Sequence, residues 1–229
     1  MRRLPLLLFP TAKDYLWGVS RLNDDFNLGI NIYPFAEAWV CSTHPDGESV
    51  VPSLDCTLSD LLMRHPDWLG SHPLSITGGK PELPILIKLI DARQDLSIQV
   101  HPDDDYAREH EGQPGKTEMW YVLDAKANTS LVYGLRRNST PEEIREAINS
   151  GTIQNLLNHV PVHKNDLFFI EAGTIHAIGA GALIAEIQEN SNVTYRLYDY
   201  GRVDKHGKQR PLHLEKALSV ASLHNSVSP

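Results

Sequence analysis

Short apolar runs separated by turn residues recur along this chain, and they predict a mainly β fold. The longest of these runs, 84–90, is almost wholly apolar and predicts a buried strand. In 96–101, aliphatic residues alternate with polar ones, which is the pattern of a strand whose two faces differ. Further strands are expected at 183–188 and 193–200, at 160–170 around a turn, and at 120–123 and 130–133 as the two arms of a hairpin.

The first 56 residues carry shorter apolar runs between glycine and proline breakers, which suits short antiparallel strands at 6–9, 30–33 and 38–41. The first ten residues have the outline of a secretion signal. However, their apolar run is short, Pro5 and Pro10 interrupt it, and no small-residue cleavage site follows. We therefore interpret this segment as an opening strand.

Four helices are expected, and the segment 73–84 with its Gly78-Gly79 pair is expected to be a loop. The clearest helix is 140–150, where Thr140 is the cap, Pro141 occupies the first position and Glu143 completes a capping box. The others are 57–69, 103–110 with an aspartate cap, and a terminal helix at 212–223.

The arrangement of these elements predicts one domain, 1–229, built as a β-barrel or jelly roll with α-helices attached outside it. The barrel core is expected at 84–200, with a helical insert at 140–158. Strands and a helix in 1–83 would pack on this core, and 201–229 would end the chain with a helix.

Composition narrows the class of protein. The chain has 229 residues, of which 41% are hydrophobic and 22% charged, as in ordinary soluble globular proteins. Its net charge of −8 opposes nonspecific nucleic-acid binding, and no segment has the length of a membrane span. Two cysteines without a CxxC spacing exclude zinc-ribbon and thioredoxin motifs. They suit a cytoplasmic protein, and the alternative of one disulfide between them stays open.

Three polar patterns carry the candidate chemistry. Ser97, Gln99 and His101 share one strand face, Glu118 opens an apolar run, and His176 follows a glycine turn. If neighbouring strands bring them together, these nitrogen and oxygen donors suit a divalent first-row metal such as zinc. Taken singly, each pattern is also typical of a half-exposed strand, a solvated ion pair or a structural histidine.

The motifs together resemble the cupin core of type I mannose-6-phosphate isomerases. The resemblance is carried by Gln99-x-His101-Pro102-Asp103, by 116–120 (Lys-Thr-Glu-Met-Trp), by 171–176 (Glu-Ala-Gly-Thr-Ile-His) and by 192–196 (Asn-Val-Thr-Tyr-Arg). Trp17-Gly18 and 41–45 extend the resemblance over nearly the whole chain. Longer members of the family carry a second small β domain after the terminal helix.

The resemblance implies a cupin jelly roll that holds one zinc ion per chain and converts mannose 6-phosphate into fructose 6-phosphate through a cis-enediol. It implies four metal ligands, which are Gln99, His101, Glu118 and His176. It also implies catalytic roles for Arg196, Glu186 and Lys116, and substrate contacts from Ser97, Lys116 and Arg196. Arginine remains protonated, so Arg196 is expected to stabilise charge, while Glu186 is expected to exchange protons.

Alternatives remain open at this point. Arg196 would alternatively pair with Asp199 at the surface, Lys116 with Glu118, and Glu186 with solvent. The whole chain would alternatively be a non-catalytic sugar-binding or sensing cupin, or an iron-dependent oxygenase. The expected partner is a small sugar phosphate, with no nucleic acid or membrane, and the oligomeric state is left open.

Overall fold

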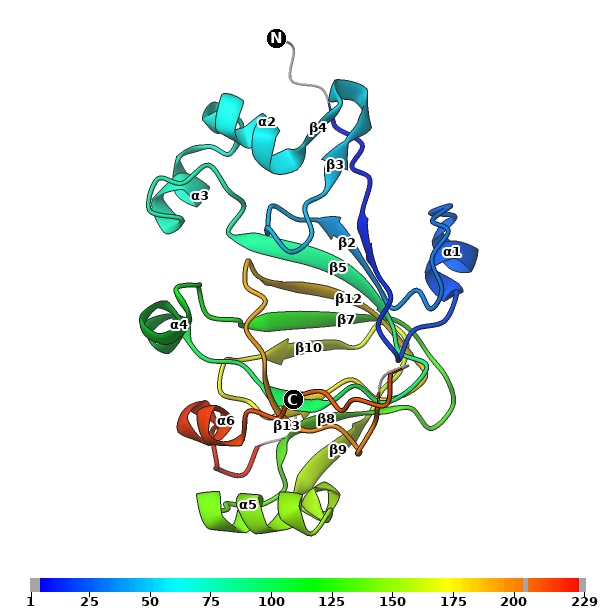
Figure 1. The fold of residues 1–229 in the computed structure, drawn as a ribbon, viewed down its shortest axis with the longest axis vertical. Coiled ribbons are helices and arrows are strands. Elements are labelled where there is room, and N and C mark those ends of the chain that lie inside the picture. The colour runs from blue at the N-terminus through cyan, green and yellow to red at the C-terminus, as the bar shows by residue number, and fades with distance from the viewer. Residues whose placement is uncertain (1–4, 204–205, 227–229) are drawn as a thin grey trace.

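The computed structural model describes residues 5–203 and 206–226 and consists mainly of two antiparallel β-sheets (Figure 1). The six-stranded sheet has the order β1 (Thr11–Lys13), β2 (Glu37–Cys41), β5 (Ile85–Asp91), β12 (Ala182–Glu189), β7 (Glu118–Ala125) and β10 (Leu167–Ile170). The five-stranded sheet has the order β13 (Tyr195–Tyr198), β6 (Ile98–Val100), β11 (His176–Ala177), β8 (Ser130–Leu135) and β9 (Leu157–Pro161). A small pair, β3 (Val50–Val51) and β4 (Cys56–Thr57), directly precedes α2 (Leu58–Arg64).

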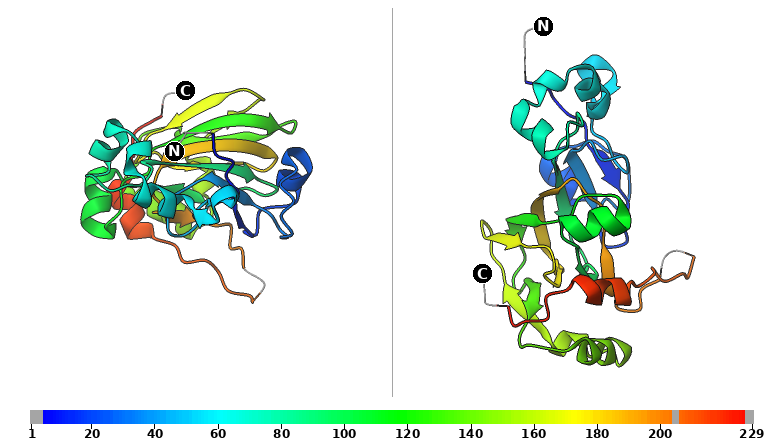
Figure 2. Two further views of the ribbon diagram at one scale, coloured as in Figure 1. Left: turned by 90° about the horizontal axis from the view of Figure 1, so that it is seen from above. Right: turned by 90° about the vertical axis from the view of Figure 1, so that its left-hand side faces the viewer.

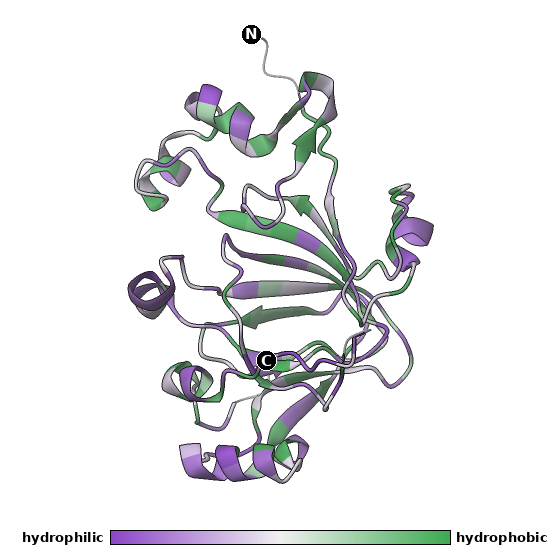
Figure 3. Ribbon diagram, in the orientation of Figure 1, coloured by the Kyte–Doolittle hydropathy of each residue, from purple (hydrophilic) through white to green (hydrophobic). Residues whose placement is uncertain are grey.

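The two sheets bury their facing sides against each other, and the alternation seen in the sequence sets which residues point inward. One core cluster joins Ile90, Trp120 and Ile184 of the six-stranded sheet to Leu96, Leu131 and Ile178 on the other side. A second cluster lies beneath the helices that cover the five-stranded sheet. Figure 3 shows the resulting alternation of apolar and polar segments along the strands.

The helices lie outside the sheets, and several gather at one end of the molecule (Figure 2). Their bounds are α1 (Arg21–Phe26), α2 (Leu58–Arg64), α3 (Ser71–Ile76), α4 (Asp104–Glu111), α5 (Pro141–Asn149) and α6 (Leu214–Val220). Short 3₁₀ turns occupy Pro52–Leu54, Pro66–Trp68 and Ile153–Asn155. Among the described residues, no helix has both the length and the apolarity needed to cross a membrane.

Helix α5 begins as the sequence predicts. The Thr140 hydroxyl accepts a hydrogen bond from the Glu143 N–H, and the Glu143 carboxylate accepts one from the Thr140 N–H. Each bond satisfies a backbone group that would otherwise lack a partner at the helix start. The buried side of the helix, with Ile144 and Ile148, packs on the core beneath it.

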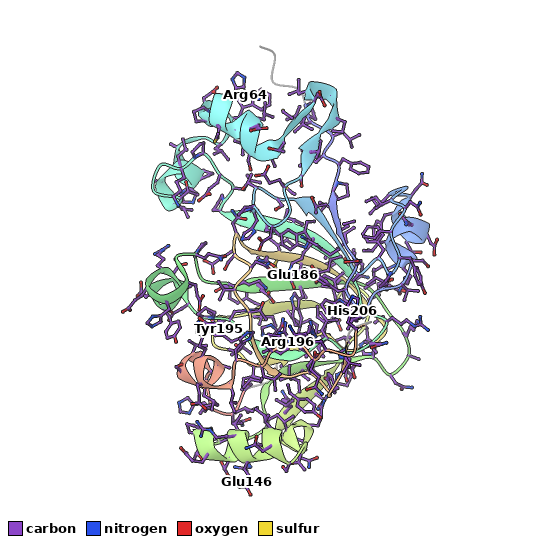
Figure 4. The ribbon with its side chains drawn as sticks, in the orientation of Figure 1. Arg64, Glu146, Glu186, Tyr195, Arg196 and His206 are labelled. Atoms are coloured by element: carbon purple, nitrogen blue, oxygen red, sulfur yellow. The ribbon has the colours of Figure 1, made fainter. Side chains whose placement is uncertain are left out.

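Replacing Thr140 with alanine is therefore expected to lower the free energy of unfolding by about 1 kcal/mol, because the cap is lost while the core contacts remain. Urea denaturation measures this change. Glu146→Ala is the matched control, since Glu146 is exposed near the other end of the same helix (Figure 4). Its effect should stay within about 0.5 kcal/mol. Equal losses in the two variants would contradict the role given to the cap.

The predicted hairpin of 120–123 and 130–133 is wrong. Strand β7 pairs with β10 and β12, whereas β8 pairs with β9 and β11 in the other sheet. The chain crosses from one sheet to the other between them. The predicted 160–170 strands likewise become β9 and β10, which lie in different sheets around the turn that contains His163. A short loop can join two paired strands of a hairpin, or it can connect strands in two packed sheets. Loop length therefore does not distinguish the two connections.

Three N-terminal predictions also need correction. The run 30–33 forms no strand; Ile30 instead exchanges hydrogen bonds with the Asn23 side chain, and its neighbours pack on Phe35. The opening strand is Thr11–Lys13 rather than 6–9, where Phe9 alone bridges to Val50, and residues 1–4 lie outside the described part. The first part of the expected 73–84 loop is helical, since α3 extends to Ile76. Proline is tolerated in the first turn of a helix, because the N–H that it lacks would have no partner there.

Candidate active site

Three buried side chains from both sheets converge between them. His101 directly follows β6, His176 opens β11, and Glu118 opens β7 on the facing sheet. Each is 1% exposed, and their donor atoms all lie within 4.8 Å of one another. The interpretation that these strands are neighbours needs correction, because the histidines and the glutamate face each other across the two sheets.

The backbone fixes the orientation of both imidazoles. His101 Nδ1 lies 2.8 Å from the Val193 carbonyl oxygen, and His176 Nδ1 lies 2.8 Å from that of Thr174. Since a carbonyl only accepts, each Nδ1 carries the proton and each Nε2 keeps its lone pair. The Nε2 atoms face the Glu118 carboxylate at 3.2 Å for His101 and 3.6 Å for His176.

The turn before His176 locks this arrangement. Gly173 has a φ of +86°, a conformation that glycine adopts without strain, and its N–H donates to the His101 carbonyl oxygen at 2.8 Å.

Burial lowers the pKa of His101 to about 3 and also lowers the pKa of His176. Both rings are therefore neutral at physiological pH. Two neutral imidazoles and one carboxylate form a donor set that fits a zinc ion.

Gln99 lies at the edge of this cluster. It pairs in register with His176 across β6 and β11, and its Nε2 is 3.5 Å from His176 Nε2. Its Oε1 accepts a hydrogen bond from the Ser97 hydroxyl at 3.2 Å. A half-turn of the amide would put the oxygen beside His176, so the geometry is compatible with a fourth ligand, and the ligand role of Gln99 stays a prediction.

Lys116 is buried in the cluster and forms an ion pair with Glu118, with its ammonium 3.2 Å from His101 Nε2. The structure thus contains the Lys116–Glu118 ion pair, which the sequence left open as an alternative. Burial raises the pKa of Glu118, but the Lys116 ammonium outweighs it and holds that pKa well below its usual range. The carboxylate is therefore ionised and available to a cation.

A second buried charge network adjoins the cluster through an indole. Trp120 Nε1 donates to Glu118 at 3.1 Å and to Glu186 at 2.9 Å. The other oxygen of Glu186 lies 2.9 Å from the Lys88 ammonium in an ion pair, and Glu37 lies 3.8 Å from the same ammonium. Glu186 is thus not solvated, and burial together with the Glu118 charge raises its pKa.

Sequence reasoning missed Lys88 and Glu37. A signal for Lys88 was present: it interrupts an apolar run, and the period-2 pattern places it on the same inward face as Leu86 and Ile90. A lysine on the buried face of a central strand requires acidic partners. No comparable signal marks Glu37, because the nearby Trp39 makes this segment read as an ordinary part of the core.

A cavity of about 340 Å³ opens beside the cluster, and the two sheets together form its walls. Its lining contains all of the predicted catalytic and substrate residues, which are Ser97, Lys116, Glu186 and Arg196, and also the predicted ligand Gln99. Figure 4 shows Glu186 and Arg196 in the middle of the molecule, on strands β12 and β13. The volume falls in the usual range of small-molecule sites, roughly 300–1,000 Å³.

Arg196 does not form the surface pair with Asp199. Its Nε donates to the Ser97 hydroxyl at 3.3 Å and its Nη1 to the Pro211 carbonyl at 2.9 Å. Asp199 forms ion pairs with Arg202 and Arg210 instead.

A larger cavity of about 400 Å³ lies near α3 and α4 and includes none of the predicted catalytic or ligand residues. The chemistry of the lining, rather than volume, therefore identifies the site.

Comparison with known proteins agrees with this geometry. Residues 6–130, more than half of the chain, match the family model of the type I phosphomannose isomerase catalytic domain. Over 223 residues the chain is 43% identical to the probable mannose-6-phosphate isomerase GmuF of Bacillus subtilis, covering 96% of this chain and 69% of that protein. The chain belongs to the type I phosphomannose isomerase family. The resemblance drawn from the sequence motifs is thus confirmed.

Other relatives of this isomerase support the assignment. The mannose-6-phosphate isomerase of Streptococcus mutans is 39% identical over 222 residues, which cover 96% of this chain and 68% of that one. The crystal structure of the Bacillus subtilis mannose 6-phosphate isomerase superposes with a TM-score of 0.86 at 39% identity, over 96% of this chain and 69% of the other. A putative mannosephosphate isomerase from Archaeoglobus fulgidus, 23% identical with a TM-score of 0.80, shares the fold over 99% of this chain and 71% of its own.

Proposed function

We propose that this isomerase converts mannose 6-phosphate into fructose 6-phosphate with one zinc ion per chain. The observation that carries the proposal is the convergence of His101, Glu118 and His176, with both Nε2 lone pairs and an ionised carboxylate directed to one point beside a polar cavity. Gln99 is proposed as the fourth protein ligand.

A zinc ion held there would supply Lewis acidity toward the oxygens of an open-chain sugar. The protein's own residues would do the rest. The raised pKa of Glu186 makes its carboxylate a stronger base, which suits it to take a proton from C2 and return one to C1 through a cis-enediol. Arg196 would stabilise the negative charge that develops on the oxygens, because its guanidinium remains protonated.

Ser97 and Lys116 are proposed to contact the substrate. The Ser97 hydroxyl lies between Gln99 and Arg196, to which it is hydrogen-bonded, and it lines the cavity. Lys116 also lines the cavity, yet its ammonium is directed at Glu118. Its substrate role therefore requires the side chain to rotate away from Glu118 toward the cavity.

We propose further that 1–229 is a single cupin-type jelly roll, with 1–83 and 201–229 packed on a core at 84–200 that carries the 140–158 insert. The two facing antiparallel sheets support this architecture. A cytoplasmic location is proposed as well, and it is supported by Cys41 and Cys56, which are both free thiols.

The decisive experiment is an assay with purified protein, in which fructose 6-phosphate is measured by coupled reduction of a nicotinamide and bound metals by elemental analysis. We expect saturable turnover and about one zinc per chain. Chelation should remove both, and added zinc should restore both. Saturable binding of mannose 6-phosphate without product would instead favour a sugar-binding module, and iron at one equivalent would overturn the zinc assignment.

A further inference from the structure

A second arginine lies in the wall of the same cavity. Arg210 lines it together with Arg196, although it comes from an irregular segment after the last strand. Three hydrogen bonds tie this segment to Arg196: Arg196 Nη1 donates to the Pro211 carbonyl, the His213 N–H donates to the Arg196 carbonyl, and the Arg196 N–H donates to His213 Nδ1. These bonds therefore fix the position of the segment that carries Arg210 relative to Arg196.

The Arg210 side chain is fixed in advance. Its Nε and Nη2 donate to the two oxygens of Asp199 at 2.8 and 2.6 Å, and its guanidinium carbon lies 5.0 Å from the centre of the Trp17 ring. This fork-to-fork pair uses one edge of the guanidinium and leaves the Nη1 group outside the pair. A pre-ordered arginine of this kind loses little side-chain entropy when it binds an anion.

The charges around Arg210 do not cancel. Asp199 is shared between Arg202 and Arg210, while the two acids that line the cavity, Glu37 and Glu186, already flank Lys88. Burial lowers the pKa of Arg196, and the nearby Arg210 charge lowers it further. Two like charges in one cavity wall disfavour each other, and a doubly charged anion between them would relieve that cost.

The indole of Trp17 provides an independent indication of a ligand. Trp17 lines the cavity and is 7% exposed, yet its buried N–H has no hydrogen-bond partner among the described residues. A buried donor without a partner costs free energy, and such donors are found where a ligand or water completes the site. This donor belongs to the same ring over which the Arg210 guanidinium is placed.

We propose that Arg210 binds the phosphate group of the substrate beside Arg196 and sets the preference of the site for phosphorylated over neutral sugars. This inference rests on the proposed function and adds a binding residue to it. A purely structural alternative is that Arg210 only neutralises Asp199. Arg202 tests that alternative, because it pairs with the same carboxylate and is not among the cavity-lining residues.

The experiment compares Arg210→Gln with Arg202→Gln in the zinc-loaded enzyme. Loss of a charge-assisted contact to phosphate should raise the KM for mannose 6-phosphate about 10- to 100-fold in the Arg210 variant, with kcat changed less than about threefold. The Arg202 variant should stay within about twofold of wild type in both. Arg210→Lys, which keeps the charge but not the fork, should fall between wild type and Arg210→Gln, and thermal unfolding checks that each variant is folded.

Two competitive inhibitors separate phosphate recognition from general damage. Inhibition by inorganic phosphate should weaken in the Arg210→Gln variant by a factor similar to that of KM, while inhibition by the neutral hexitol mannitol should not change. Equal effects of the two arginine variants, or weakened binding of both inhibitors, would overturn the role of Arg210. If wild type does not isomerise mannose 6-phosphate, the proposed function fails instead, and calorimetric titration with inorganic phosphate then judges Arg210 alone.

Discussion

Replacing His176 with alanine is expected to abolish both metal binding and turnover. Its Nε2 is one of three donors that converge within 4.8 Å, and catalytic zinc sites commonly use three protein ligands. Zinc should fall from about one equivalent to near zero. Because the Lewis acid supplies several kcal/mol of stabilisation to the reaction, kcat/KM should drop at least about 1,000-fold. Elemental analysis and the coupled assay measure the two quantities on the same samples.

His163→Ala is the matched control for this variant, since the His163 side chain is 82% exposed on the turn between β9 and β10. It should keep full zinc and full activity. His101→Ala should behave like His176→Ala, because the two rings present equivalent lone pairs to Glu118. Zinc and turnover retained in both buried-histidine variants would refute the ligand set and, with it, the proposed mechanism.

Much of the site could be predicted because alternation reports which side chains share a face. The pattern at 96–101 placed Ser97, Gln99 and His101 on one side of a strand, and the structure has Ser97 and Gln99 lining one cavity and His101 beside it. Glycine at 173 indicated the turn that precedes His176. The grouping of these motifs with Glu118 nevertheless came from family resemblance, since no local pattern shows which distant strands meet.

In the core of the fold, the wrong predictions concern which strands pair rather than where the strands lie. The strands at 120–123 and 130–133 exist, yet they lie in different sheets, because each must bury one face against the opposite layer. Period-2 alternation is identical for a strand in either sheet. The same limit applies to Glu118: the sequence places it on a strand but does not say that it faces the histidines across the core instead of lying beside them.

The buried ion pairs behind the site lead to the second large prediction. Lys88 is 6% exposed and lies 2.9 Å from Glu186 and 3.8 Å from Glu37, both also buried. Burial lowers the pKa of Lys88, but the two carboxylates outweigh it and raise that pKa overall, so the lysine is charged. Lys88→Met keeps the volume of the side chain and removes the charge. It leaves the carboxylates uncompensated and should lower the free energy of unfolding by about 3–5 kcal/mol.

The exposed pair Arg108–Asp104 in α4 provides the control. Arg108→Met should cost less than about 1 kcal/mol in the same urea titration, because solvent screens exposed charges. The double variant Lys88→Met with Glu186→Gln should recover part of the loss, since one uncompensated carboxylate is then neutral. Additive losses in the double variant would show that Lys88 and Glu186 do not stabilise each other.

The pH dependence of the Lys88→Met deficit follows from the sign of the Glu186 shift. Burial and the Glu118 charge already raise the pKa of Glu186 above its unfolded value, and removal of Lys88 raises it further. A carboxyl with a raised pKa favours folding once it is protonated, and this gain is lost as pH rises through the folded pKa. The deficit of Lys88→Met relative to wild type should therefore shrink as the pH falls from alkaline values toward the raised pKa of Glu186. A deficit that stays constant or grows on acidification would contradict the proposed coupling between Lys88 and the protonation of Glu186.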